Sequence, residues 1–246
     1  ADSRPQLTAG QAEAVRAIEE TISAGQHDTI LLHGVTASGK TEVYLHAIEA
    51  ALARGRDAIV LLPEIALTAQ IVEVFKSRLG DRVALLHSRL STGERYDEWQ
   101  RLRTGEARVA VGPRSALFAP CRNPGLIVLD EEHEPSYKQE NAPRYHARRT
   151  ALQRARASDS VLVLGSATPS IESYYLASQE EYRLLSLAER VPGRNLPAVR
   201  VVDMRRQPLQ GAQGIFSDDL QQALADCVHA GRQAVLFLNR RGHSRR

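Results

Sequence analysis

Short runs of apolar residues recur along the chain, and segments with helical spacing separate them. The runs do not alternate apolar with polar residues, which is typical of strands buried on both faces of a parallel sheet. The expected strands are 29–32, 58–62, 83–86, 108–111, 126–129 and 161–164. We therefore predict an α/β fold, in which a parallel sheet carries helices on both faces.

Helices are expected between these strands, and two of them begin with recognisable caps. Thr8 precedes apolar residues at helical spacing and is the expected N-cap of the first helix. Ser91 and Glu94 have the spacing of a capping box. Further helices are expected at 42–48 and 67–79.

The segment 34–41, Gly-Val-Thr-Ala-Ser-Gly-Lys-Thr, fits the phosphate-binding loop pattern G-x-x-x-x-G-K-[ST] and follows the first expected strand. Glycines let backbone N–H groups converge on phosphates, Lys40 can reach the β- and γ-phosphates, and the Thr41 hydroxyl can hold Mg²⁺. The loop predicts a nucleoside triphosphate ligand, and the alternative is a glycine-rich turn before a helix. The residues expected to bind the nucleotide are Gly34, Thr36, Ser38, Gly39, Lys40 and Thr41.

Gln11 lies near the start of the first expected helix, upstream of this loop. Its side-chain amide can both donate and accept hydrogen bonds, as the edge of an adenine requires. We therefore consider Gln11 a candidate adenine contact, with a surface glutamine as the alternative.

A polar or Gly/Pro cluster follows each expected strand. Because the carboxyl ends of parallel strands share one edge of the sheet, these clusters are expected to form one ligand-binding rim. The clusters are 34–41, 63–64, 87–88, 112–115, 130–133 and 165–168.

The cluster at 130–133, Asp-Glu-Glu-His, carries the candidate catalytic groups beside Lys40. Asp130 is expected to reach the Mg²⁺ held by Thr41, and Glu131 to orient and deprotonate the attacking water. His133 is expected to link the γ-phosphate to movement elsewhere. The alternatives are an acidic turn after a strand and a surface histidine.

Composition sets limits on the class of protein. At 246 residues and 43% apolar content the chain can bury a core, so disorder is excluded. The net charge is only +3. A genome biased toward GC-rich codons explains the excess of arginine over lysine as well as nucleic-acid binding does, so this excess is weak evidence for a nucleic-acid partner. Cys121 and Cys227 are isolated, which argues against a disulfide framework or a zinc site and fits a reducing, cytosolic setting.

No apolar run approaches the roughly 20 residues that a membrane span needs, and the first residues lack a signal-peptide pattern. The chain does not begin with methionine, and it ends in arginine shortly after an expected strand. We therefore expect it to be a fragment of a longer protein.

At this point the motifs resemble a known group. The segments 34–41, 130–133 and 165–169 are similar to motifs I, II and III of the DExH branch of superfamily-two helicases, and 61–68 is similar to motif Ia. The resemblance narrows to the primosomal replication-restart helicases and runs from about residue 7 to 242. The stretches that carry this narrower resemblance are 41–44, 63–70, 111–120, 136–139, 144–148 and 237–242.

The resemblance implies a RecA-like P-loop NTPase lobe at 1–187, a linker at 188–198 and the beginning of a second RecA-like lobe at 199–246. It implies ATP and Mg²⁺ as cofactors, and zinc only in a C-terminal part beyond this chain, where the arginine fingers also belong. The implied function is ATP-driven DNA unwinding with three-prime to five-prime polarity in the bacterial cytoplasm, at the nucleoid. The implied partners are single-stranded and forked DNA, with primosome proteins and single-stranded DNA-binding protein for the full-length protein.

In the family, the stretch after motif II is an aromatic-rich loop that couples DNA binding to hydrolysis, and here it corresponds to 136–148. Its tyrosines can stack on bases and its basic residues can meet phosphates; a solvated basic helix at 145–156 is the alternative. The sequence departs from the family pattern at Ala37, where glycine is common, at Arg149, where aspartate is usual, and at 141–143, which lacks a tryptophan. The residues expected to contact DNA or couple to it are Pro63, Thr68, Arg114, Tyr137, Lys138, Arg144, Tyr145, Arg148, Ser166 and Thr168.

The last part of the chain is expected to contain strands at 182–187, 199–203 and 233–238, with a helix that Ser217 caps.

Two other functions remain open. A nucleotide-gated DNA-binding lobe without turnover of its own is one. A P-loop kinase of a small molecule is the other, although it does not predict an acidic pair followed by His133 or a basic aromatic loop.

Overall fold

The computed structural model describes residues 5–188, 198–204 and 216–237. The chain divides into two compact units, Ala1–Arg194 and Asn195–Arg246, and each is described by itself. The division falls within 188–198, the range expected to be a linker, most of which lies outside the described residues.

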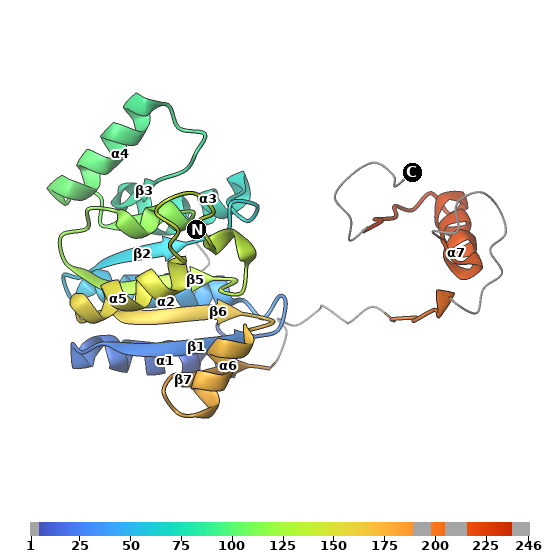
Figure 1. Cartoon of the computed structure of the whole chain (residues 1–246), viewed down its shortest axis with the longest axis horizontal. Coiled ribbons are helices and arrows are strands. Elements are labelled where there is room, and N and C mark those ends of the chain that lie inside the picture. The colour runs from blue at the N-terminus through green and yellow to red at the C-terminus, as the bar shows by residue number, and fades with distance from the viewer. Residues whose placement is uncertain (1–4, 189–197, 205–215, 238–246) are drawn as a thin grey trace. The chain divides into compact units, whose positions relative to one another are not determined.

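The first unit is built on one sheet of seven strands, all of which pair in parallel (Figure 1). The strand order is β3-β4-β2-β5-β6-β1-β7. The strands are β1 (Asp28–Gly34), β2 (Asp57–Leu61), β3 (Val83–Leu85), β4 (Val109–Gly112), β5 (Pro124–Asp130), β6 (Val161–Ser166) and β7 (Arg183–Leu187). The predicted parallel sheet is confirmed, and the segment expected as a strand at 182–187 becomes its edge strand, paired with β1.

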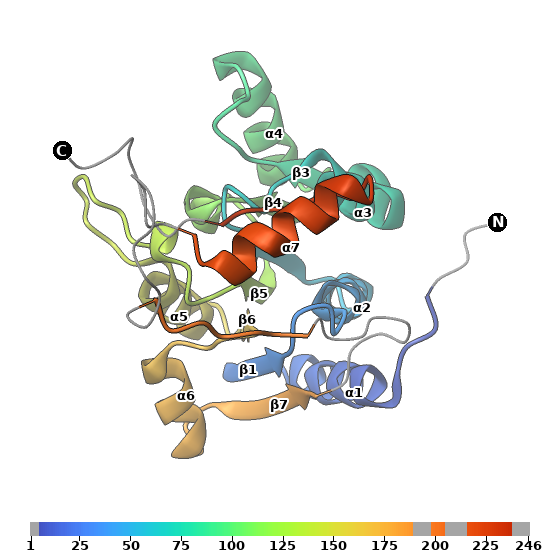
Figure 2. The ribbon, with the colours of Figure 1, turned by 90° about the vertical axis from the view of Figure 1, so that its right-hand side faces the viewer.

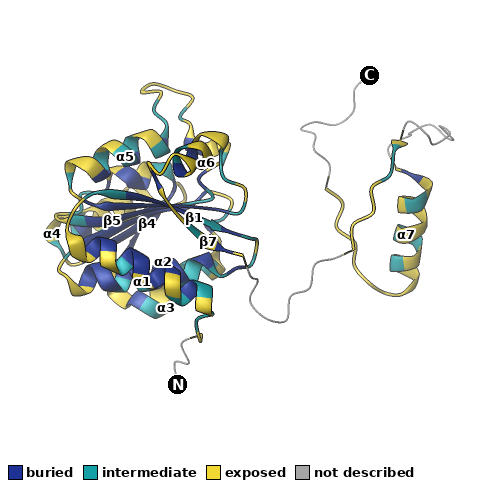
Figure 3. Cartoon of the chain, turned by 90° about the horizontal axis from the view of Figure 1, so that it is seen from below, coloured by how far each residue is buried: buried dark blue, intermediate teal, exposed yellow. Residues whose placement is uncertain are grey.

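Helices cover both faces of this sheet, as the sequence predicted (Figure 3). Successive residues of a strand point to opposite faces, so Ile30 and Leu32 join one apolar cluster while Leu31 joins the other. The first cluster contains α1 (Ala9–Ala24), α2 (Lys40–Ala53) and α3 (Ala69–Leu79). The second contains α4 (Thr92–Thr104), α5 (Ala147–Ala157) and α6 (Ile171–Ser178). Figure 2 shows β7 beside β1, with α1 and α6 flanking them.

Local capping chemistry sets where several helices begin. Thr8 and Gln11 form a capping box on α1, and Ser91 and Glu94 form one on α4, so both predicted caps are confirmed. Thr68 caps α3 by accepting from the N–H of Ile71, which starts that helix at Ala69 rather than at residue 67. These side chains satisfy N–H groups that a helix cannot satisfy internally.

In the second unit, α7 (Asp218–His229) begins at Ser217, whose side chain accepts from the N–H of Leu220. This helix was predicted. The strands expected at 199–203 and 233–238 are wrong in the described part, since 199–203 and 233–237 contain no strand, and residue 238 lies outside it. Val201 and Val235 are 90% and 95% exposed, so these apolar runs lack the partner strand and the burial that would make them strands.

None of the helices in the described part of the chain has the length and apolar character that crossing a membrane requires.

A close contact between α2 and β6 shapes the middle of the first unit. Tyr44 of α2 is 1% exposed, and its ring lies over Gly165, which sits between Leu32 of β1 and Asp130 of β5 in the sheet. A Cβ atom at Gly165 would lie 1.7 Å from the Tyr44 hydroxyl oxygen and 2.8 Å from its Cζ. Glycine is therefore required at this position for steric reasons.

We expect Gly165→Ala to destabilise the protein by about 1–3 kcal/mol, the usual cost of overpacking a core. Urea unfolding followed by circular dichroism measures this. Gly93→Ala is the control, because Gly93 has no atom within 4 Å of an added Cβ and lies in α4, where alanine is the better helix former. Equal stability of the wild type and Gly165→Ala would contradict the steric account.

Candidate nucleotide site and strand-end rim

The phosphate-binding loop joins β1 to α2 at the carboxyl edge of the sheet. Gly39 has φ 78°, in the left-handed region that favours glycine, and α2 begins directly after it at Lys40. The first N–H groups of α2 and its dipole therefore face the loop, an arrangement suited to binding an anion.

The interior of the loop is folded tightly enough to form a cradle. A Cβ at Gly34 would lie 2.5 Å from Ser38 Oγ and 3.1 Å from Lys40 Cγ, so a side chain there would fill the turn. Ser38 is 2% exposed and its hydroxyl has no hydrogen-bond partner within the protein. A buried donor without a partner costs free energy, and a phosphate oxygen can satisfy it. The loop thus fits the predicted phosphate ligand, with Thr36 exposed on it.

Ala37, which stands where glycine is common in the family pattern, has φ 65°. A residue with a Cβ pays about 1–2 kcal/mol in this left-handed region. The loop keeps its course with alanine, and the strain explains why glycine suits the position.

Lys40 connects the loop to the acidic cluster. It is 9% exposed, its Nζ donates to the carbonyl of Gly34 at 3.1 Å, and Nζ lies 3.5 Å from Glu131 Oε1. The loop lysine and the candidate catalytic acid therefore meet in one site, although they are far apart in the sequence.

Asp130 is the last residue of β5, and one of its carboxylate oxygens accepts a hydrogen bond from a side chain of α2. The Tyr44 hydroxyl donates to Asp130 Oδ1 at 2.8 Å, across β6. Burial raises the pKa of Asp130, while the Tyr44 hydrogen bond and nearby Lys40 lower it. Burial and the Asp130 charge raise the pKa of Tyr44, which keeps its hydroxyl a donor.

Mg²⁺ prefers oxygen ligands and usually keeps waters and substrate phosphates, with one or two ligands from the protein. Thr41 and Asp130 supply such oxygens at the same edge of the sheet. Within residues 5–188, 198–204 and 216–237, no three His, Cys, Asp or Glu side chains are grouped to hold a metal without such help.

Glu131 and His133 extend the site along the rim. Glu131 has φ 47°, an uncommon conformation for a residue with a side chain and one found at functional sites. His133 Nδ1 lies 3.7 Å from Glu131 Oε2 and 2.7 Å from Ser166 Oγ. Ser166 Oγ also accepts from the N–H of Thr168 at 3.0 Å, so this chain of contacts links the end of β5 to the end of β6.

The sequence did not single out Glu132, which anchors a buried network. It is 1% exposed, and its carboxylate accepts from Arg148 Nη1 at 2.8 Å, from the N–H of Ser170 at 2.6 Å and from Ser173 Oγ at 3.0 Å. A buried carboxylate needs such partners. The network ties the acidic cluster to the first turns of α5 and α6.

Gln11 is 4% exposed, so the surface-glutamine alternative is wrong. Its Nε2 donates to the carbonyl of Ser38 at 2.8 Å, and its Oε1 accepts from the N–H of Thr8 at 2.8 Å. Gln11 also lines a cavity of about 720 Å³ together with Gly39 and Thr41. The adenine contact stays a prediction, next to the phosphate loop and beside a cavity of suitable size.

The family model described as DEAD/DEAH box helicase matches residues 8–176, which is more than half of the chain. The chain belongs to this helicase family. The matched range includes the phosphate loop, the acidic cluster and the turn after β6.

Curated proteins extend the likeness. The chain is 53% identical over 238 residues to the replication restart protein PriA of Bacillus subtilis, covering 97% of this chain and 30% of that protein. It is 46% identical over 249 residues to PriA of Synechocystis, covering 99% of this chain and 30% of that protein. The chain therefore spans about a third of the length of these relatives.

Solved structures share the fold. The structure of RecG bound to a three-way DNA junction matches with a TM-score of 0.58 and 24% identity, covering 78% of this chain and 25% of that one. The helicase domain of Pyrococcus furiosus Hef matches with a TM-score of 0.54 and 22% identity, covering 76% and 39%. At these identities the likeness supports the RecA-like fold of the first unit.

One of the DNA contacts expected from the helicase motifs is wrong. Tyr137 is 1% exposed, and its hydroxyl donates to the carbonyls of Leu61 and Asp130, so its ring is packed in the core and cannot stack on a base. Arg148 is partly exposed and forms an ion pair with the buried Glu132, and its contact with a phosphate stays a prediction. Both side chains help to position the acidic cluster.

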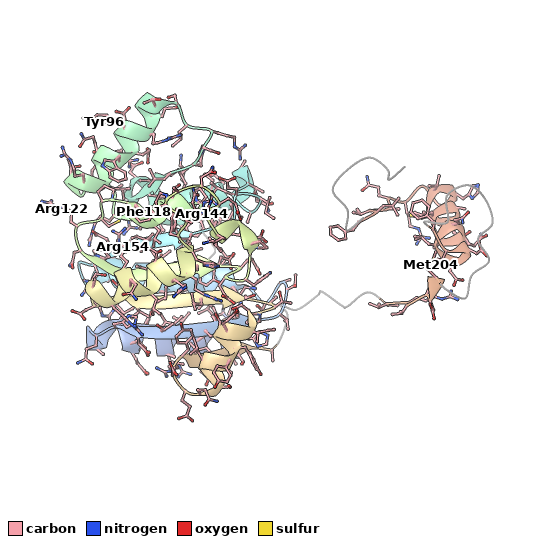
Figure 4. The ribbon with its side chains drawn as sticks, in the orientation of Figure 1. Tyr96, Phe118, Arg122, Arg144, Arg154 and Met204 are labelled. Carbon is pink, nitrogen blue, oxygen red and sulfur yellow. The ribbon has the colours of Figure 1, made fainter. Side chains whose placement is uncertain are left out.

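Among the other expected contacts, Ser166 is fully buried, whereas Arg114 and Tyr145 are partly exposed. Arg114 donates to the carbonyls of Ser136 and Lys138, and Lys138 Nζ donates to the carbonyl of Arg144. Tyr145 packs edge-on against exposed Phe118, with ring centroids 5.1 Å apart; Figure 4 labels Phe118 and Arg144. Lys138, Arg144 and Thr168 are exposed.

The two residues of motif Ia that are expected to contact DNA differ in their exposure. Pro63 is buried, and Thr68 is exposed while its hydroxyl caps α3. Their contact with DNA stays a prediction.

The helix α5 follows the loop 136–148 and buries three alanines at helical spacing: Ala147, Ala151 and Ala155. The alternative of a fully solvated basic helix at 145–156 is therefore wrong for this face of α5.

We expect Tyr44→Phe to weaken the Mg²⁺-dependent part of nucleotide binding about tenfold, because a hydrogen bond to a charged group contributes roughly 1.5–3 kcal/mol. Its loss also removes an influence that lowers the pKa of Asp130, so the Mg²⁺-dependent binding should disappear at a higher pH as the solution is acidified. Titration of a fluorescent ATP analogue with Mg²⁺ or with EDTA, from pH 5 to 8, measures both effects.

The control for this prediction is Tyr175→Phe, which removes the hydroxyl of a tyrosine that is 60% exposed on α6. Binding in EDTA should be the same for all three proteins. An unchanged Mg²⁺ response in Tyr44→Phe would show that the hydroxyl does not position Asp130.

Proposed function

We propose that this chain is the nucleotide-binding part of an ATP-driven DNA helicase that acts in replication restart. The observation that carries the proposal is the contact of Lys40 Nζ with Glu131 Oε1 at 3.5 Å, which brings motif I and motif II residues into one site. The family match and the likeness to PriA proteins support DNA as the substrate class.

In this proposal the loop N–H groups, Ser38 and Lys40 bind the β- and γ-phosphates. Thr41 and Asp130 hold Mg²⁺, which when bound neutralises charge on these phosphates. Glu131 orients a water molecule in line with the γ-phosphate and takes its proton.

His133, Ser166 and Thr168 then form the path by which the occupied site affects the strand ends around it. His133 contacts both Glu131 and Ser166, so a change at the γ-phosphate reaches the segment after β6 through two contacts. The buried Glu132 network ties the same cluster to α5, directly after the loop 136–148. This is the connection that coupling of hydrolysis to DNA requires.

The finer functional assignments rest on the resemblance to replication-restart helicases. They are three-prime to five-prime movement, loading of replication proteins at forked DNA, and action at the bacterial nucleoid with primosome and single-stranded DNA-binding proteins. Residues 1–187 form the first motor lobe in this proposal, 188–198 link it to the second, and 199–246 begin the second lobe.

A second candidate is a nucleotide-gated DNA-binding lobe without turnover. One observation favours this candidate: the chain spans only 30% of the length of the Bacillus subtilis protein. Hydrolysis normally needs an arginine finger, supplied from elsewhere, to stabilise the transferring phosphate. We therefore expect this chain alone to bind Mg-ATP and hydrolyse it slowly. Vigorous DNA-stimulated turnover by the chain alone would contradict that expectation.

We expect Lys40→Ala to abolish detectable nucleotide binding, because it removes the cation aimed at the phosphates. Isothermal titration with Mg-ATP measures the change. Lys76→Ala is the matched control, since it removes the same charge from an exposed position on α3. Unchanged affinity in Lys40→Ala would refute the assignment of the loop.

We expect Glu131→Gln to keep Mg-ATP affinity within about threefold and, in the full-length protein, to lower the single-turnover hydrolysis rate by roughly 10²–10⁴, the range for loss of a general base. The two measurements together separate binding from catalysis. Loss of binding with an unchanged rate would assign Glu131 to the nucleotide pocket and not to the water.

A further inference from the structure

A second cavity lies at the strand-end edge, away from the phosphate loop. It has a volume of about 250 Å³ and lies beyond the ends of β2, β3 and β4. Its volume suits one planar ring system, because whole drug-sized ligands occupy roughly 300–1,000 Å³. Its walls are the Trp99 indole, Leu86 and Pro113, with Arg95, Ser88 and Ser115 as polar groups.

The aromatic wall of this cavity is a side chain of α4 that is only partly buried. Leu102 is the one buried residue of α4, whereas Trp99 is 39% exposed and Tyr96, one turn earlier, is 60% exposed. Figure 4 shows Tyr96 on α4, away from the sheet. An indole left partly open at a cavity presents a π-face that a ligand can stack on.

His87 provides an independent indication of a ligand. His87 is one of the residues that line the same cavity, and its Nδ1 is buried with no hydrogen-bond partner within the protein. A buried polar atom without a partner costs free energy, which a polar ligand in the cavity can recover. The cavity is therefore not a purely apolar gap between α4 and the sheet.

The cavity continues into the surface that carries the expected DNA contacts. Glu64 and Pro113 line it and also line a neighbouring cavity, which adds Arg114 and Ser136. Arg114 in turn holds the loop 136–148 through the carbonyls of Ser136 and Lys138. A strand of DNA that crosses the edge at Arg114 therefore passes the mouth of the Trp99 cavity.

We propose that this cavity receives one base of single-stranded DNA, which stacks on Trp99 while Arg95 meets a neighbouring phosphate. The inference rests on the proposed function and adds a base-binding subsite to it. Stacking suits any base, since every base has a π-face, and His87, Ser88, Ser115 and Glu64 offer polar groups to its edge. The subsite would hold the strand in register on the first motor lobe.

Trp99 is the single tryptophan of the chain, so its emission reports on this cavity alone. A fluorescein-labelled single-stranded oligonucleotide of mixed sequence reports overall binding by anisotropy, and the unlabelled oligonucleotide reports the cavity by tryptophan quenching. We expect both signals to saturate with the same Kd. Trp99→Ala should weaken binding about tenfold, and Trp99→Phe should restore most of the loss.

Three further variants guard against a change in α4 itself. Arg95→Ala keeps the Trp99 reporter and should weaken binding and flatten its salt dependence, because one phosphate contact is lost. Arg103→Ala and Tyr96→Ala, exposed residues of the same helix that do not line the cavity, should bind DNA as the wild type does.

The outcomes separate this inference from the proposed function. DNA binding by anisotropy with unaltered Trp99 emission, and with wild-type affinity in Trp99→Ala, overturns the base subsite and leaves the proposed function standing. Equal losses in Trp99→Ala and Tyr96→Ala also overturn it, since the effect then belongs to α4 as a whole. Absence of DNA binding by the wild type overturns both.

Discussion

Seven parallel strands end along one edge of a single sheet, and the chemistry of the first unit depends on that alignment. The phosphate loop follows β1, the acidic cluster follows β5, and the Ser166 turn ends β6, which lies between them. Parallel pairing places these ends together whatever their distance in the sequence. The contact between Lys40 and Glu131 is the direct result.

Buried polar groups then fix the side chains of this edge in place. The Tyr44 hydroxyl reaches Asp130 because Gly165 leaves room above β6, and Tyr137 donates to the backbone at Leu61 and Asp130. Glu132 ties the cluster to α5 and α6. Each of these groups must be hydrogen-bonded when buried, so the site is held by contacts that are costly to break. A rigid site of this kind can pass a change at the nucleotide to the loop 136–148.

Local sequence signals were sufficient for much of this fold. The N-cap at Thr8, the capping box at Ser91, the apolar runs and the glycine-lysine loop are short-range patterns, and the structure contains them where the sequence predicted them. Burial is not a short-range property. A tyrosine after motif II can face DNA or the core with the same residue type, and Tyr137 proved to face the core. The apolar runs at 199–203 and 233–237 failed as strands because strand formation needs a neighbour that the sequence does not specify locally.

We propose that one sheet edge binds both nucleotide and single-stranded DNA and couples them. Reciprocal titration tests it most directly: the Kd for a labelled oligonucleotide is measured with and without saturating Mg²⁺ and a non-hydrolysable ATP analogue, and the Kd for the analogue with and without the oligonucleotide. The account predicts that each ligand changes the affinity of the other by the same factor, about fivefold or more, as linkage requires. Two ligands that both bind with unaltered affinities would contradict it.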